Sequence, residues 1–101
     1  MAPPKHLSQE SKREWRALTA AYSIDEAGFH LLEQFFEAKE RRSAARAIVD
    51  RDGLMIDGRL KDQKIAHPML QVERDSAAVM TRAWRLLGFD LEPARDRDAE
   101  T

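Results

Sequence analysis

The 101-residue sequence contains no cysteine and only four glycines and four prolines. Without cysteine the chain can form no disulfide and offers no thiolate for catalysis or metal binding. So few glycine and proline residues exclude a loop-rich or many-stranded fold and favour an all-α one. No apolar run approaches the ~20 residues of a membrane-spanning helix, and the first residues lack the apolar core of a signal peptide. We therefore expect a cytoplasmic protein without a membrane partner.

An excess of charge of one sign is also absent, because the 17 basic and 18 acidic residues leave a net charge of −1. The charges are unevenly distributed, however. Residues 39–64 carry eight basic and five acidic side chains, a net of +3, whereas residues 88–101 carry two basic and five acidic side chains, a net of −3. The basic middle is the electrostatic feature that favours a nucleic-acid partner.

Apolar residues at helical spacing, together with capping residues, predict three helices. Ser8 is a good N-cap for a first helix that ends near Ala21. Asp25 caps a second helix of about 27 residues, or ~40 Å, which Gly53 ends. A third helix begins at His67-Pro68 and ends at Gly88.

An Asp57-Gly58 pair lies between two short apolar runs in residues 54–61, which predicts a β-hairpin with its turn at that pair. We therefore predict a mostly all-α fold: a short helix plus two long antiparallel helices joined by a small β-hairpin. Residues 1–7 are expected to be a disordered N-terminus, residues 8–88 a single helical oligomerisation domain, and residues 89–101 a partly ordered acidic tail.

Catalytic patterns are missing from the sequence. His6, His30 and His67 are far apart and match no zinc-binding spacing. His67 stands before the helix-opening proline, so we interpret it as a structural cap. There is no glycine-rich phosphate-binding loop and no Gly-x-Ser-x-Gly motif. We expect no enzyme activity, no catalytic, cofactor-binding or metal-binding residues, and no small-molecule substrate.

Two candidate surfaces remain, one basic and one apolar. The candidate nucleic-acid contacts are Lys39, Arg41, Arg42, Arg46, Arg59, Lys61 and Lys64, which could bind phosphates. The simpler interpretation of the same residues is a salt-bridged helix surface. The apolar residues of the second helix are too many for one stripe, which predicts packing on more than one side and an oligomer interface. The candidate interface residues are Phe29, Leu32, Phe35 and Phe36.

The order of these features resembles the small subunits of phage terminases, specifically the P-twenty-seven type. The resemblance covers about residues 7–97. The matching segments are LSQESKREWRALTAAY, AGFHLLEQFFEAKERRSAARAIVDRDG and HPMLQVERDSAAVMTRAWRLLGFDLEPARDR. The matching positions are Trp15, Tyr22, Gly53, His67-Pro68, Leu87-Gly88-Phe89, Pro93, Arg95 and Arg97.

This resemblance implies a homo-oligomeric ring that recognises viral double-stranded DNA and regulates the large terminase subunit, which carries the ATPase and nuclease activities. The sequence departs from that family in lacking a strongly basic separate DNA-binding domain. Two alternatives stay open. One is a small helix-turn-helix transcription regulator, although Asp25 and Glu26 are poor residues to place beside phosphates. The other is a protein-only interaction module, which the net charge of −1 permits.

Overall fold

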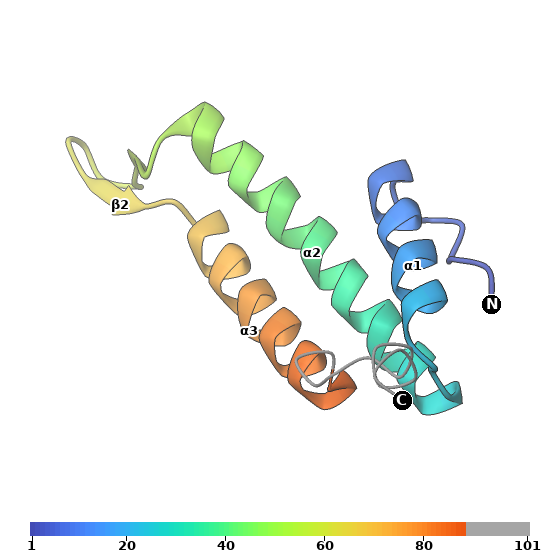
Figure 1. Ribbon diagram of the computed structural model, residues 1–101. Coiled ribbons are helices and arrows are strands. Elements are labelled where there is room, and N and C mark those ends of the chain that lie inside the picture. Colours follow the sequence, from blue (N-terminus) through green and yellow to red (C-terminus); the bar gives the residue numbers. More distant parts are fainter. Residues whose placement is uncertain (89–101) are drawn as a thin grey trace.

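The computed structural model describes residues 1–88, which form three helices and a two-stranded hairpin (Figure 1). The elements are α1 (Gln9–Ala21), α2 (Glu26–Asp52), β1 (Met55–Asp57), β2 (Lys64–Ala66) and α3 (Met69–Leu87). The two long helices lie antiparallel, and the hairpin connects them at one end. The predicted fold class is confirmed. The expected acidic tail, and the resembling positions after Gly88, lie outside the described residues.

The helix ends are fixed by the residues that the sequence indicated. The Ser8 hydroxyl oxygen accepts a hydrogen bond of 3.2 Å from the Ser11 N–H, and Asp25 Oδ1 accepts one of 2.7 Å from the Gly28 N–H. Gly53 ends α2 with a φ of 91°, and Gly88 ends α3 in the left-handed region with a φ of 73°. Only glycine reaches such angles without strain. The predicted bounds of α1 and α2 and the predicted end of α3 are confirmed; α3 begins at Met69, one residue after Pro68.

The largest buried side chains lie between α1 and the first half of α2. Trp15 is 2% exposed, and its ring stacks on Phe29 with centroids 5.9 Å apart and lies 6.1 Å from Phe36. Leu7 joins this core at 4% exposure. The Trp15 indole N–H also donates to the Met1 carbonyl at 3.1 Å. The N-terminal segment therefore covers one side of the tryptophan.

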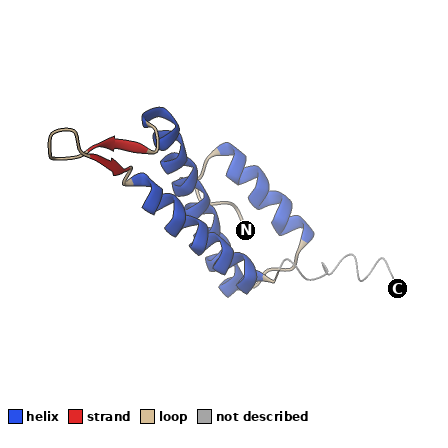
Figure 2. Ribbon diagram, turned by 90° about the vertical axis from the view of Figure 1, so that its left-hand side faces the viewer, coloured by secondary structure: helices blue, strands red, loops and turns tan. Residues whose placement is uncertain are grey.

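The opposite side of α2 packs along α3, so α2 has two neighbours within its own chain (Figure 2). Their contact is lined by small buried residues: Ala38, Ala45 and Val49 from α2, and Ser76 and Ala83 from α3. Small side chains let two helices approach closely. The prediction that α2 packs on more than one side is confirmed. Its wide apolar surface is largely covered by α1 and α3 of the same chain.

The hairpin differs from the prediction in its turn. Asp57 lies in β1 and pairs with Lys64, and residues 58–63 form the loop, so the two-residue turn at Asp57-Gly58 is wrong. The Gln63 side chain closes this loop by accepting the Leu60 N–H at 3.0 Å. In the observed register Ile56 faces Ile65, whereas the shorter turn would have put Arg59 opposite Ile56. Pairing of apolar side chains on one face therefore outweighs the local turn signal.

Candidate nucleic-acid interface

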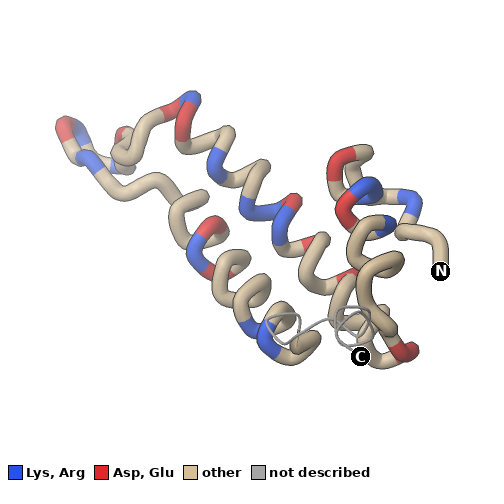
Figure 3. Tube along the Cα trace, viewed as in Figure 1, with Lys and Arg blue, Asp and Glu red and all other residues tan. Residues whose placement is uncertain are grey.

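All of the predicted basic residues except Lys39, which contacts α1, lie in the half of the molecule that α1 leaves uncovered (Figure 3). The N-terminus of α1 reaches α2 at Glu40, where Glu40 Oε1 accepts the Ser8 N–H at 2.5 Å. Beyond that point α2 carries Arg41, Arg42 and Arg46, and the hairpin adds further cations. Because the hairpin extends past the ends of α2 and α3 (Figure 1), its charges are accessible to a large ligand.

Three of the seven predicted contacts already have an acidic partner. Lys39 Nζ lies 2.5 Å from Glu14 Oε2, with its side chain 29% exposed, and thereby ties α2 to α1. Arg46 Nη1 lies 3.9 Å from Glu73 Oε1 on α3. Lys64 pairs with Asp57 across the hairpin and holds the pKa of that carboxyl below its ordinary value. For these three residues the structure agrees with the salt-bridged surface.

The other four cations, Arg41, Arg42, Arg59 and Lys61, form no ion pair with any residue in the range 1–88. Arg41, Arg59 and Lys61 are exposed, and Arg42 is half-buried. A phosphate contact by such a side chain need not first break an internal salt bridge. The structure therefore divides the predicted set in two and leaves these four as the better candidates for phosphate contacts.

The predicted set was confined to residues 39–64, and it therefore left out a pair of cations on α3, Arg82 and Arg85. Arg82 and Arg85 are exposed on α3 and likewise form no ion pair within the described part of the chain. Their spacing of three residues places them on the same side of a helix, and this spacing was the available signal. They lie near the end of α3 that is remote from the hairpin. A DNA duplex bound to the cations of α2 and the hairpin therefore need not contact Arg82 and Arg85.

A clasp of three side chains joins the end of α2 to the start of α3. His67 is 7% exposed; its Nε2 lies 2.9 Å from Asp52 Oδ2, and its Nδ1 accepts the Met69 N–H at 3.0 Å. Arg51 donates to both oxygens of Asp52, at 2.7 and 3.1 Å. The hydrogen bonds from Arg51 and His67 hold the pKa of the Asp52 carboxyl well below its ordinary value.

The geometry of the clasp also decides its chemistry. Because Nδ1 accepts a backbone N–H, the ring proton resides on Nε2, which donates it to Asp52. Both ring nitrogens are thus engaged, and neither is left to remove a proton from a substrate. This supports the interpretation of His67 as a structural cap of α3.

The four candidate interface residues differ in burial. Leu32 and Phe36 are 0% exposed and belong to the core of the chain itself. Phe29 and Phe35 are half-buried and pack against that core. Phe35 also contacts Trp84, with ring centroids 5.1 Å apart. Of the four, only the partly exposed Phe29 and Phe35 are accessible to another molecule without a change in the fold.

One group of side chains has the spacing of a cation site. His6, Glu33 and Glu37 each offer a ligand atom, and these atoms lie within 4.8 Å of one another. His6 Nε2 already bonds Glu37 Oε2 at 2.9 Å, and its side chain is 55% exposed. Sequence spacing could not show this group, because His6 is 31 residues from Glu37. The observed role of the contact is to attach the N-terminal segment to α2.

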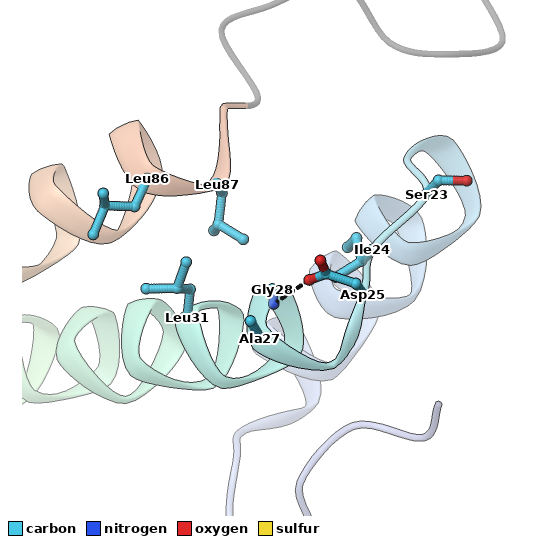
Figure 4. A pocket seen from close by; sticks show the side chains of 8 residues that line it. All are labelled: Ser23, Ile24, Asp25, Ala27, Gly28, Leu31, Leu86 and Leu87. Atoms are coloured by element: carbon cyan, nitrogen blue, oxygen red, sulfur yellow. Dashed lines mark hydrogen bonds between the residues drawn. The ribbon is translucent and has the colours of Figure 1, made fainter.

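A hollow of about 590 Å³ lies where the start of α2 meets the end of α3 (Figure 4). Leu31, Leu86 and Leu87 form its apolar part, and Asp25 lies at its polar edge. The Asp25 carboxylate already caps the α2 N-terminus through Gly28. That end of the helix therefore presents a carboxylate in the place where an anion would bind.

Within residues 1–88 no helix is both long enough and apolar enough to span a membrane. No curated protein and no solved structure matches the chain. The sequence model of the family described as "phage terminase, small subunit" does match, over residues 9–98. This match covers all three helices, the hairpin and the free cations of α2 and the hairpin. The chain therefore belongs to the phage terminase small-subunit family.

Proposed function

We propose that this protein, a small terminase subunit of the P-twenty-seven type, is a non-catalytic adaptor for packaging viral DNA in the host cytoplasm. It forms a homo-oligomeric ring, recognises viral double-stranded DNA and regulates the large subunit that carries the ATPase and nuclease activities. The observation that carries the proposal is the family match over residues 9–98. The engagement of both ring nitrogens of His67 agrees with a non-catalytic role.

The DNA contact that we propose runs along the uncovered half of α2 and the hairpin. Arg41, Arg42, Arg59 and Lys61 make the contacts, because they are free of ion pairs within residues 1–88. Four cations per chain give weak binding on their own. Repetition of the same patch on every subunit of a ring raises the effective affinity without any new type of contact.

The helix-turn-helix alternative is less well supported. In that reading α1 and the start of α2 would enter DNA, with α2 as the recognition helix. The first half of α2 is instead packed between α1 and α3, and its first residues include the exposed acids Asp25 and Glu26. A recognition helix needs an open face toward the major groove and tolerates few carboxylates there.

A gel-shift titration at several salt concentrations tests the DNA contact. We expect Arg41→Gln/Arg42→Gln and Arg59→Gln/Lys61→Gln each to weaken binding. Each lost phosphate contact should lower the slope of log affinity against log salt by about 0.9 for duplex DNA. The matched control is Arg82→Gln/Arg85→Gln, which removes the same charge from the remote end of α3.

Light scattering on every variant must show an unchanged multimer, because loss of the ring would imitate loss of contacts. If both test variants assemble normally and bind DNA with the affinity of the wild type, this interface is ruled out. Weakening by the control alone would move the contact to α3. A wild-type protein that binds no duplex DNA at low salt would contradict the DNA-recognition part of the proposal.

A further inference from the structure

The hairpin has two free edges whose backbone groups can be assigned from its register. The pair Leu54/His67 is joined by a bond of 2.8 Å from the His67 N–H, and Gly58/Gln63 by one of 2.9 Å from the Gly58 N–H. Hydrogen-bonded pairs alternate with non-hydrogen-bonded pairs in an antiparallel ladder. The backbone N–H and C=O groups of Met55 and Asp57 therefore point outward on the β1 edge, and those of Lys64 and Ala66 do so on the β2 edge.

Neither edge is covered by another strand within residues 1–88, since the sheet has two strands. Exposed apolar side chains accompany these edges: Leu54 is 63% exposed, Met55 53%, Leu60 70% and Ile65 37%. An isolated two-stranded hairpin is marginally stable in water, and an unpaired apolar edge promotes pairing with another chain. Within residues 1–88, four of the six exposed large apolar side chains thus lie in or beside the hairpin; the other two are Met1 and Leu86, and none lies on α2.

The charges at the two edges are opposite. Asp57 lies on the β1 edge and Lys64 on the β2 edge, and the two already attract each other across the hairpin. Pairing two β1 edges in register at Asp57 would bring carboxylates together, and pairing two β2 edges at Lys64 would bring ammonium groups together. A β2 edge beside a β1 edge instead repeats the attraction that exists within the hairpin.

We propose that the β2 edge of one copy of this chain pairs, antiparallel, with the β1 edge of a second copy. Lys64 then lies beside Asp57 of the neighbouring copy, and Ala66 beside its Met55, in the register of the hairpin itself. The contact is heterologous, so in an open assembly only the two terminal copies keep a free edge, and these two edges pair when the rotation closes a ring. The inference rests on the oligomer in the proposed function and names the surface that makes it.

Disulfide trapping tests this pairing. Because the protein has no native cysteine, every cross-link must come from the introduced residues. Asp57→Cys and Lys64→Cys are purified separately, mixed and oxidised, and cross-linked dimers are measured on a denaturing gel. Facing residues of a hydrogen-bonded antiparallel pair have Cα atoms about 5.5 Å apart, which is within disulfide range. We expect a dimer in the mixture and none in either variant alone. Ala20→Cys, at an exposed position of α1, mixed with Lys64→Cys controls for random collision.

If Asp57→Cys or Lys64→Cys fails to fold, a second pair tests the same register without removing a charge. This pair is Met55→Cys mixed with Ala66→Cys. Light scattering on the wild type separates the outcomes. If the wild type is a multimer but neither cysteine pair cross-links more than the collision control, the edge contact is wrong and the proposed ring still stands. A multimer whose Asp57→Cys variant cross-links with itself leads to the same conclusion. A wild type that stays monomeric at high concentration overturns the ring and this contact together.

Discussion

His67 and Asp52 are joined by a hydrogen bond of 2.9 Å across the base of the hairpin, and the same histidine caps α3 through its other nitrogen. One side chain thus fixes the last turn of α2 to the first turn of α3. The backbone supports the same junction, since the His67 N–H donates to the Leu54 carbonyl at 2.8 Å. These contacts fix the position of the hairpin where it joins α2 and α3.

Replacement of this histidine should destabilise the protein. We expect His67→Ala to lower the free energy of unfolding by about 1–3 kcal/mol, through loss of a helix cap and of a hydrogen bond to a charged group. Urea titration followed by circular dichroism measures the change. His30→Ala, which removes an exposed histidine from α2, should have little effect. Equal losses in the two variants would contradict the capping role.

The low pKa of Asp52 predicts acid sensitivity. A carboxyl whose folded pKa lies below its ordinary value of 3.8 contributes stability that is fully present above that value and lost as pH falls below it. Wild type should therefore lose stability more steeply than Asp52→Asn over that acidic range. The measurement is the urea midpoint as a function of pH. Asp50→Asn, on the same turn of α2, is the control, and its profile should follow that of wild type.

The two tryptophans should differ in their effect on stability. Trp15 is 2% exposed and contacts two phenylalanines, so Trp15→Ala should cost about 3–5 kcal/mol. Trp84 is half-buried against Phe35, and its removal should cost less, since less apolar surface returns to water. Thermal and urea unfolding of both variants test this ranking. A larger loss for Trp84→Ala would show that the core is centred on α3.

The two helix-ending glycines give a further ranking. Gly53 has φ 91° and ψ 165°, a region that essentially only glycine occupies, whereas Gly88 lies in the left-handed helical region at φ 73° and ψ 24°. Gly53→Ala should cost about 1–3 kcal/mol, and Gly88→Ala should fall at the lower end of that range. Unfolding midpoints measure both. The reverse order would mean that the chain after Asp52 can change its path at little cost.

Local signals in the sequence were sufficient for the helices. Ser8, Asp25 and Gly53 act on backbone groups within four residues of themselves, so their roles could be read without a structure. The hairpin register could not, because it depends on which apolar residues face each other across six loop residues. The state of each cation was equally inaccessible: Lys39 is neutralised by Glu14, 25 positions away, while nearby Arg41 has no such partner within residues 1–88. Sequence reasoning therefore located the basic region but could not separate free charges from paired ones.

The six-residue loop at the tip of the hairpin has a practical consequence. It is closed by its own contacts, Gly58 and Leu60 with Gln63, and Asp62 takes up the turn with a φ of 61°. Lengthening such a loop costs little, since closure entropy grows only with the logarithm of its length. A peptide epitope or a fluorophore-binding tag inserted after Lys61 would leave the clasp and the helix pair unchanged. The tip is thus a place where a reporter of folding can be attached without disturbing the helix pair.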